Sequence, residues 1–187
     1  SGPGSNNFGS GFYTVDDYRE ILQYAQDRNI EVIPEFDMPG HGHAPIRAME
    51  ARYAAYIDSD PARATEFLLS DPEDESRYVS IQYFRSNAFN PCMNSSYDFV
   101  RKIVQEVKAM HADIQPLKIF HFGGDEQPHG TWVGSPACHA FLGTPNVTEQ
   151  QAKDLKAHFV TEVGKVVYEE GLDLAGWEDG LMHNAEP

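Results

Sequence analysis

The sequence predicts an α/β fold in which helices connect the strands of a small parallel β-sheet. Helical periodicity alternates with short apolar runs along the 187 residues, and three of these runs lead directly into polar clusters. This alternation is typical of βαβ units, whose connecting helices make neighbouring strands parallel. Three strands are evident, whereas a closed barrel of eight strands takes about 250 residues. The residues therefore indicate either a small open sheet or part of a barrel.

The first helix is predicted to begin at Thr14. Thr14 and Asp17 match a capping box, in which two side chains bond each other's backbone N–H groups. Apolar residues then recur at helical spacing as far as Ala25, and Asn29 can end the helix. Residues 1–11 are rich in Gly, Ser and Asn, so they are predicted to form a loop.

A strand over residues 30–36 follows, predicted from its β-branched residues despite Pro34, which a central strand tolerates poorly. The second helix is predicted at about residues 43–57. Residues 58–94 are long, irregular and interrupted by three prolines. A segment of this length inside a compact domain is usually a functional loop or an insertion.

The second half of the chain continues the alternation. A helix capped by Ser95 or Ser96 is predicted to run to about His111, before a strand over residues 117–121. A Gly/Pro-rich loop is predicted over residues 127–147.

The last helix and strand are marked by local signals. Thr148 and Gln151 match a second capping box, and Gly171 can end the helix that they start. A final strand is predicted over residues 172–177.

The composition excludes some classes of partner. The formal net charge of −15 and the acidic pI of about 4.7 argue against nucleic acid or an anionic membrane. No apolar run approaches the length of a membrane span. Cys92 and Cys138 allow either a disulfide or two free thiols. With the glycosylation patterns at Asn94 and Asn146, they favour a secreted, periplasmic or lysosomal protein.

Three polar clusters follow the three predicted strands, at residues 37–41, 123–126 and 177–179. Parallel strands in α/β enzymes present their chemistry at their carboxyl ends. A lone acid at such a position is usually a helix cap or a solvated loop residue, but three clusters at one sheet edge indicate a site. The adjacent acids Asp125 and Glu126 suggest proton transfer, and cleavage of a glycosidic bond is the main candidate.

The adjacency of Asp125 and Glu126 restricts the mechanism. Neighbouring residues on a strand point to opposite faces, so the two acids do not readily flank one bond as ordinary glycosidases require. They can still act on two atoms of one substrate. One acid would protonate the leaving oxygen while the other holds the acetamide of an N-acetyl sugar, whose oxygen attacks.

The motif from His121 to Glu126, His-x-Gly-Gly-Asp-Glu, resembles the signature of glycoside hydrolase family 20, the β-N-acetylhexosaminidases. Residues 30–41 and 176–180 are similar to the neighbouring strands and loops of that family. Residues 83–97 are similar to bacterial chitobiases in particular. The resemblance extends from Gly11 to Gly180.

The resemblance implies a (β/α)8 TIM barrel. Residues 1–187 would be a partial catalytic domain that supplies roughly strands three to five, their helices and a long βα-loop insertion. It also implies hydrolysis of terminal β-linked N-acetylhexosamine, from chitobiose, chito-oligosaccharides or glycans, with retention and substrate assistance. No cofactor or metal is needed. Neither the sugar preference nor the oligomeric state is predicted.

The resemblance also assigns roles to residues. Glu126 matches the general acid/base, and Asp125 matches the residue that orients the acetamide and stabilises its positive charge. His41 matches a histidine that is hydrogen-bonded close to the general acid/base. Trp177 matches a residue that forms a wall of the acetamide pocket. The residues expected to bind substrate are Asp37, His41, His121 and Trp177.

Several residues that this family uses have no counterpart here. They are an arginine that grips the sugar hydroxyls, a tyrosine that bonds the acetamide carbonyl, and further pocket tryptophans. The 187 residues alone are therefore expected to be inactive.

Two rival interpretations remain open. In the first, the protein is a metal-dependent hydrolase on the same barrel, with ligands drawn from Asp37, His41, His43, His121 and Asp125. In the second, it is a non-catalytic descendant that binds glycans.

Overall fold

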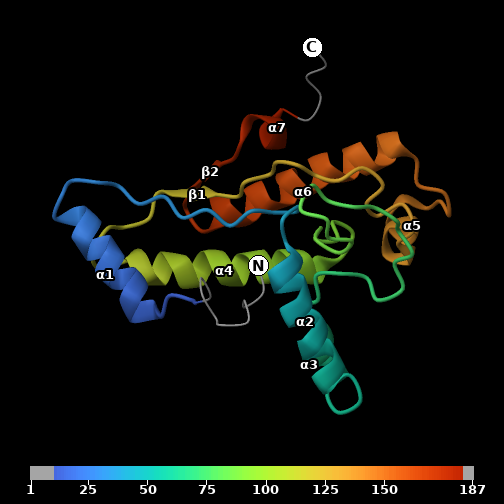
Figure 1. Cartoon of the computed structure of the whole chain (residues 1–187), viewed down its shortest axis with the longest axis horizontal. Coiled ribbons are helices and arrows are strands. Elements are labelled where there is room, and N and C mark those ends of the chain that lie inside the picture. The colour runs from blue at the N-terminus through green and yellow to red at the C-terminus, as the bar shows by residue number, and fades with distance from the viewer. Residues whose placement is uncertain (1–10, 183–187) are drawn as a thin grey trace.

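The computed structural model of the chain describes residues 11–182, so the loop predicted over residues 1–11 lies almost entirely outside the described residues. The chain runs from α1 to α7 (Figure 1), with four helices before the first strand, β1, and two helices between β1 and β2. In the described part, no helix combines the length and the apolarity needed to cross a bilayer. The elements are α1 (Val15–Gln26), α2 (His43–Tyr56), α3 (Pro61–Thr65), α4 (Asn94–His111), β1 (Ile119–His121), α5 (Pro136–Leu142), α6 (Glu149–Glu169), β2 (Asp173–Ala175) and α7 (Glu178–Leu181).

The sheet is parallel, as predicted. β1 pairs with β2, with Ile119 opposite Asp173 and His121 opposite Ala175. Residues 34–38 lie along the other side of β1, also in parallel, and form a bridge with His121. Three chain segments therefore end at the same edge of the sheet.

The strand predicted over residues 30–36 is wrong in extent, because only an isolated bridge at Glu35 forms there. The Pro34 carbonyl accepts from the His121 N–H, and the Phe36 N–H donates to the His121 carbonyl. Pro34 has no N–H with which to continue the ladder towards residue 30. The Val32 N–H instead donates to the side chain of Gln115, at 2.7 Å.

The helix starts follow the local signals in two cases out of three. Both predicted capping boxes are present, at the start of α1 and of α6. The prediction that Ser95 or Ser96 caps α4 is wrong, since α4 begins at Asn94 after Met93, with no side-chain cap. The two hydroxyls donate elsewhere, Ser95 to the Leu68 carbonyl and Ser96 to the Asn90 carbonyl.

The two segments predicted to be irregular contain short helices. In α3 and in α5 a proline occupies the first turn, where its missing N–H costs nothing. Asp60 and Ser135 cap these helices through their side chains. Cys92 and Cys138 form a disulfide, which joins the two segments and resolves the alternative that the sequence leaves open.

The core lies between the sheet and the two long helices, α4 and α6, which pack side by side (Figure 1). Phe120 and Phe122 are fully buried. Because side chains alternate along a strand, His121 points to the opposite side from these two rings. The core residues contributed by α4 and α6 are Val100, Val104, Phe159, Val163, Val166 and Val167.

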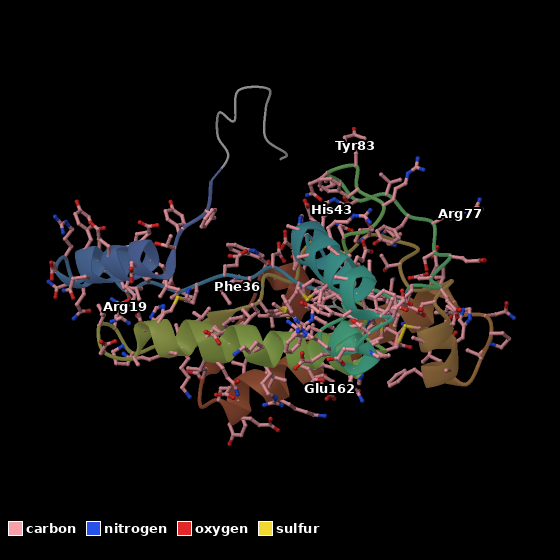
Figure 2. All side chains as sticks on the ribbon, turned by 90° about the horizontal axis from the view of Figure 1, so that it is seen from below. Arg19, Phe36, His43, Arg77, Tyr83 and Glu162 are labelled. Atoms are coloured by element: carbon pink, nitrogen blue, oxygen red, sulfur yellow. A yellow bond between two sulfur atoms is a disulfide. The ribbon has the colours of Figure 1, made fainter. Side chains whose placement is uncertain are left out.

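α1 is held against the end of α4 by a buried histidine. His111 Nδ1 donates to the Gln115 carbonyl, and its Nε2 accepts from the Tyr18 hydroxyl, both at 2.8 Å. Arg19, labelled in Figure 2, adds an ion pair to Asp113 at 2.8 Å. Both nitrogens of the neutral imidazole therefore have partners, and burial lowers the pKa of His111.

This arrangement predicts that acid destabilises the α1–α4 contact. Because the folded state favours neutral His111, the unfolded chain binds more protons below about pH 6.5, the ordinary pKa of histidine. The His111 contribution is therefore complete above that pH and is lost as the pH falls towards the lowered folded-state value. We expect the melting temperature of the full-length protein to fall more between neutral pH and about pH 5 than that of His111→Gln. Equal falls would contradict the prediction.

Candidate active site

Four of the predicted side chains meet at the sheet edge. His41 Nε2 lies 3.7 Å from Asp37 Oδ2, 3.6 Å from Asp125 Oδ2 and 3.4 Å from Glu126 Oε2. His41 and Asp37 follow the segment that bridges to β1, while Asp125 and Glu126 follow β1 itself. The ends of two parallel segments thus place three carboxylates around one imidazole nitrogen.

His41 occupies an unusual backbone conformation. Its φ is +55°, in the left-handed region that non-glycine residues rarely adopt. Its Nε2 atom is buried and has no hydrogen-bond partner among the described residues. Strained backbones of this kind are concentrated at functional sites.

Gly123 and Gly124 allow Asp37 to approach β1. The Gly124 N–H donates to Asp37 Oδ1 at 3.1 Å. Gly123 has a φ of +70°, and a Cβ there would lie 2.0 Å from the same oxygen. Gly123 therefore leaves room for Asp37, whereas Gly124 leaves room for the Phe122 ring and the Gly180 backbone, which a Cβ at Gly124 would approach to 2.6–2.9 Å.

We expect Gly123→Ala to destabilise the protein more than Gly143→Ala. Both positions have a positive φ, so each alanine costs about 1–2 kcal/mol in backbone conformation. Nothing lies within 4 Å of a Cβ at Gly143, whereas at Gly123 the collision with Asp37 adds a further ~1–3 kcal/mol. Chemical unfolding of the two variants measures the difference, and equal losses would contradict the packing described here.

Asp125 and Glu126 do not diverge as regular strand geometry predicts. β1 ends at His121, and Glu126 has a left-handed φ of +49°. Both carboxylates consequently reach the same His41 nitrogen. The expectation of opposite faces is wrong here, because the two glycines end the strand before the acid pair.

The two acids differ in their surroundings. Asp125 is partly buried, and its Oδ1 has no hydrogen-bond partner in the described part of the chain. The side chain of Glu126 is 42% exposed and accepts a hydrogen bond from Gln82 Nε2 at 3.2 Å. The Glu126 N–H donates to Asp179, which follows β2. All three predicted clusters are thereby linked.

The carboxyl group of Asp37 has a raised pKa. Burial, together with the neighbouring charge of Asp125, raises its pKa to about 6, although the Gly124 N–H and His41 oppose the rise. Asp37 therefore keeps its proton to a higher pH than an ordinary aspartate does, beside the carboxyl group of Asp125.

A second group of side chains, formed by Glu35, His121 and Trp177, lies beside the cluster around His41. Glu35 accepts a hydrogen bond from Trp177 Nε1 at 3.2 Å, and its Oε2 lies 3.3 Å from His121 Nδ1. The rings of His121 and Trp177 have centroids 4.9 Å apart, edge to face. Gly123 connects the two groups, since its N–H donates to His121 Nδ1 and its carbonyl accepts from the Trp177 N–H. Half of the Trp177 surface is exposed.

Sequence reasoning missed Glu35 and Gln82. Glu35 lies two residues before Asp37 in the same motif, so side-chain alternation could have placed the two on one face. Gln82 belongs to the long insertion, whose length predicts a functional loop but does not select a residue. Figure 2 shows this loop over α2, with Tyr83 projecting outward and His43 beneath it.

The metal-ligand set considered from the sequence is only partly assembled. Donor atoms of Asp37, His41 and Asp125 lie within 4.8 Å of one another. His43 instead donates to the Ser86 carbonyl at 2.7 Å and stacks on Phe84. His121 pairs with Glu35. Any ion in this cluster would therefore have ligands from three of the five predicted residues.

A parallel sheet whose strand ends carry clustered acids, an imidazole and an exposed indole places the chain in the class of α/β proteins with a site at the carboxyl ends of their strands. The profile of the family described as "Glycosyl hydrolase family 20, catalytic domain" matches residues 3–187, and the chain belongs to this family. The resemblance inferred from the sequence is confirmed. Catalytic domains of the family are TIM barrels, and this chain is an α/β part with a small parallel sheet.

The chain is similar to several characterised proteins. It is 43% identical to a beta-hexosaminidase of Vibrio vulnificus over 99% of its own length and 22% of that protein. It is 39% identical to an N,N'-diacetylchitobiase of Vibrio harveyi, over 98% of the chain and 24% of that protein. The chain thus spans about a quarter of the length of these relatives.

A solved structure supports the same relationship. The exo beta-N-acetylglucosaminidase of Vibrio harveyi, in complex with N-acetylglucosamine, matches with a TM-score of 0.74 and 31% identity. The match covers 95% of this chain and 24% of that one.

Proposed function

We propose that the full-length protein hydrolyses terminal, non-reducing β-linked N-acetylhexosamine residues, with retention of configuration. Its substrates are N-acetylglucosaminides such as chitobiose, chito-oligosaccharides or glycans. The observation that carries the proposal is the cluster of Asp37, Asp125 and Glu126 around His41 Nε2, at 3.4–3.7 Å. Family membership and the N-acetylglucosamine complex of the Vibrio harveyi neighbour support the substrate class.

Glu126 is the general acid/base in this proposal. Its side chain is the most exposed of the three carboxylates around His41, so it can reach a leaving-group oxygen. It would donate a proton as the glycosidic bond breaks, and would take one from water in the second step. The hydrogen bond from Gln82 Nε2, at 3.2 Å, holds the carboxylate in place, and His41 Nε2 lies 3.4 Å from it.

Asp125 is the residue that orients the acetamide. The acetamide oxygen attacks the anomeric carbon, and positive charge develops on the acetamide nitrogen. A fixed, partly buried carboxylate stabilises that charge without reorganising. The unpartnered Oδ1 of Asp125 supports this role, because it is free to accept the acetamide N–H.

The remaining residues shape the sugar site. Asp37 positions His41 and the turn after β1 through the Gly124 N–H. The exposed Trp177 indole offers an apolar face to the acetamide methyl and the sugar ring. Glu35 fixes that indole together with His121.

We further propose that residues 1–187 form part of a catalytic barrel domain, contributing roughly strands three to five. The two outer segments of the described sheet leave ladder edges that further strands would pair. The Cys92–Cys138 disulfide favours a secreted, periplasmic or lysosomal location.

Hydrolysis of 4-nitrophenyl N-acetyl-β-glucosaminide by the full-length protein tests the proposal. We expect turnover that survives a chelator, a β-configured initial product by NMR, and no turnover by the isolated 187-residue chain. Normal turnover by the isolated chain would contradict the barrel proposal. Binding of a chitobiose analogue without cleavage would favour a glycan-binding protein. Loss of activity on addition of a chelator would favour a metal-dependent hydrolase.

A further inference from the structure

Asp37, His41 and Asp125 are arranged like the ligands of a metal ion. His41 Nε2 is buried, has no hydrogen-bond partner among residues 11–182, and faces a carboxylate oxygen of Asp37 and one of Asp125. Separations of 3.6 and 3.7 Å are too long for hydrogen bonds. His41 Nε2 therefore bonds neither carboxylate, and the donor atoms of the three residues lie within 4.8 Å of one another.

The separations and the donor types together favour one kind of ion. Ligands around a tetrahedral zinc ion, at about 2.0–2.2 Å from the metal, lie about 3.4 Å apart. Adjacent ligands of an octahedral magnesium ion lie only about 2.9 Å apart. The distances from His41 Nε2 of 3.7, 3.6 and 3.4 Å match the tetrahedral value. An imidazole with carboxylates is also a donor set that suits zinc, whereas magnesium and calcium prefer oxygen ligands alone.

We propose that Asp37, His41 and Asp125 bind Zn²⁺, and that the bound ion inhibits the protein. The three residues supply one ligand atom each, and the fourth position is filled by water or by Glu126, whose Oε2 lies 3.4 Å from His41 Nε2. The site is formed by residues from the bridging segment and from the turn after β1, so no conformational change of the sheet is required.

Inhibition follows from the ligand set and rests on the proposed function. Zinc bound to Asp125 neutralises the carboxylate that is needed for the positive acetamide, and it occupies the space beside Glu126. Zinc and the N-acetyl sugar therefore exclude each other. The metal binding itself is independent of the reaction.

Calorimetric titration of the EDTA-treated, buffer-exchanged full-length protein with ZnCl₂ tests the site. We expect His41→Gln and Asp37→Asn each to abolish one zinc site or to weaken its affinity by at least ~10–100-fold. Removing a residue that only supports a metal ligand already costs this much affinity, so removing a ligand should cost no less. His43→Gln is the matched control. This neighbouring histidine bonds the Ser86 carbonyl outside the cluster, so its zinc binding should equal that of the wild type.

Zinc binding by His41→Gln with wild-type stoichiometry and affinity would overturn the proposal. If both ligand variants fail to fold, anomalous diffraction at the zinc edge from the soaked wild-type protein decides. An anomalous peak at bonding distance from His41 Nε2 would support the zinc site. The absence of such a peak would overturn the proposal. Zinc that binds here without slowing N-acetylglucosaminide hydrolysis would leave the metal site intact and would refute the proposed role of Asp125.

Discussion

Glu126→Gln should reduce hydrolysis of an N-acetylglucosaminide with a poor leaving group by about 10²- to 10⁴-fold, the usual contribution of a positioned general acid. Glutamine keeps the size of the side chain, but it has no proton to give. Substrate binding should change little, because the remaining contacts to the sugar are preserved. Steady-state kinetics and ligand titration measure the two effects separately.

The leaving group gives an internal check on this prediction. A 2,4-dinitrophenyl leaving group departs without protonation, so its release by Glu126→Gln should be impaired much less than release of a sugar. Glu162→Gln is the matched control. Glu162, labelled in Figure 2, lies on α6 and pairs with Lys165 far from the acid pair in sequence. Unchanged turnover of the poor substrate by Glu126→Gln would remove the acid/base role.

Asp125→Asn should reduce kcat by about 10²- to 10³-fold, the cost of removing one preorganised stabiliser of transition-state charge. Asparagine is close in size and can still occupy the space beside His41. It carries no charge to balance the positive acetamide. The loss should therefore appear mainly in kcat, because the charge develops only as the reaction proceeds.

The leaving group distinguishes this variant from Glu126→Gln. Asp125 assists the attack by the acetamide rather than departure of the leaving group. Hydrolysis of the dinitrophenyl substrate should therefore remain slow in Asp125→Asn. Recovery of the rate with this substrate would contradict the assigned role, as would a change confined to KM.

Local signals in the sequence predicted the helices best. The capping boxes at Thr14 and Thr148 are formed within four residues, so no tertiary information is needed to find them. The short helices α3 and α5 were missed because Pro61 and Pro136 suggest interruption, although proline at a first helical turn is also a start signal.

The meeting of Asp37, His41 and the acid pair at one sheet edge was predictable from the sequence, but their contacts were not. The motifs locate the acids and the imidazole at strand ends, and a parallel sheet brings such ends together. The shared approach to His41 Nε2 depends on the left-handed turn at Glu126 and on Gly123, which leaves room for Asp37, and no periodicity encodes either feature. Gln82 reaches Glu126 from 44 residues away in sequence, so its contact requires the fold.

In the proposed mechanism, the amide of the substrate performs the attack while Asp125 and Glu126 assist it. The most direct test compares 4-nitrophenyl N-acetyl-β-glucosaminide with its N-trifluoroacetyl analogue in the full-length protein. Fluorine withdraws electrons from the amide oxygen and weakens it as a nucleophile, so the rate should fall by more than an order of magnitude. Equal rates for the two substrates, or a sugar attached to a side chain in the intact mass spectrum, would contradict the claim.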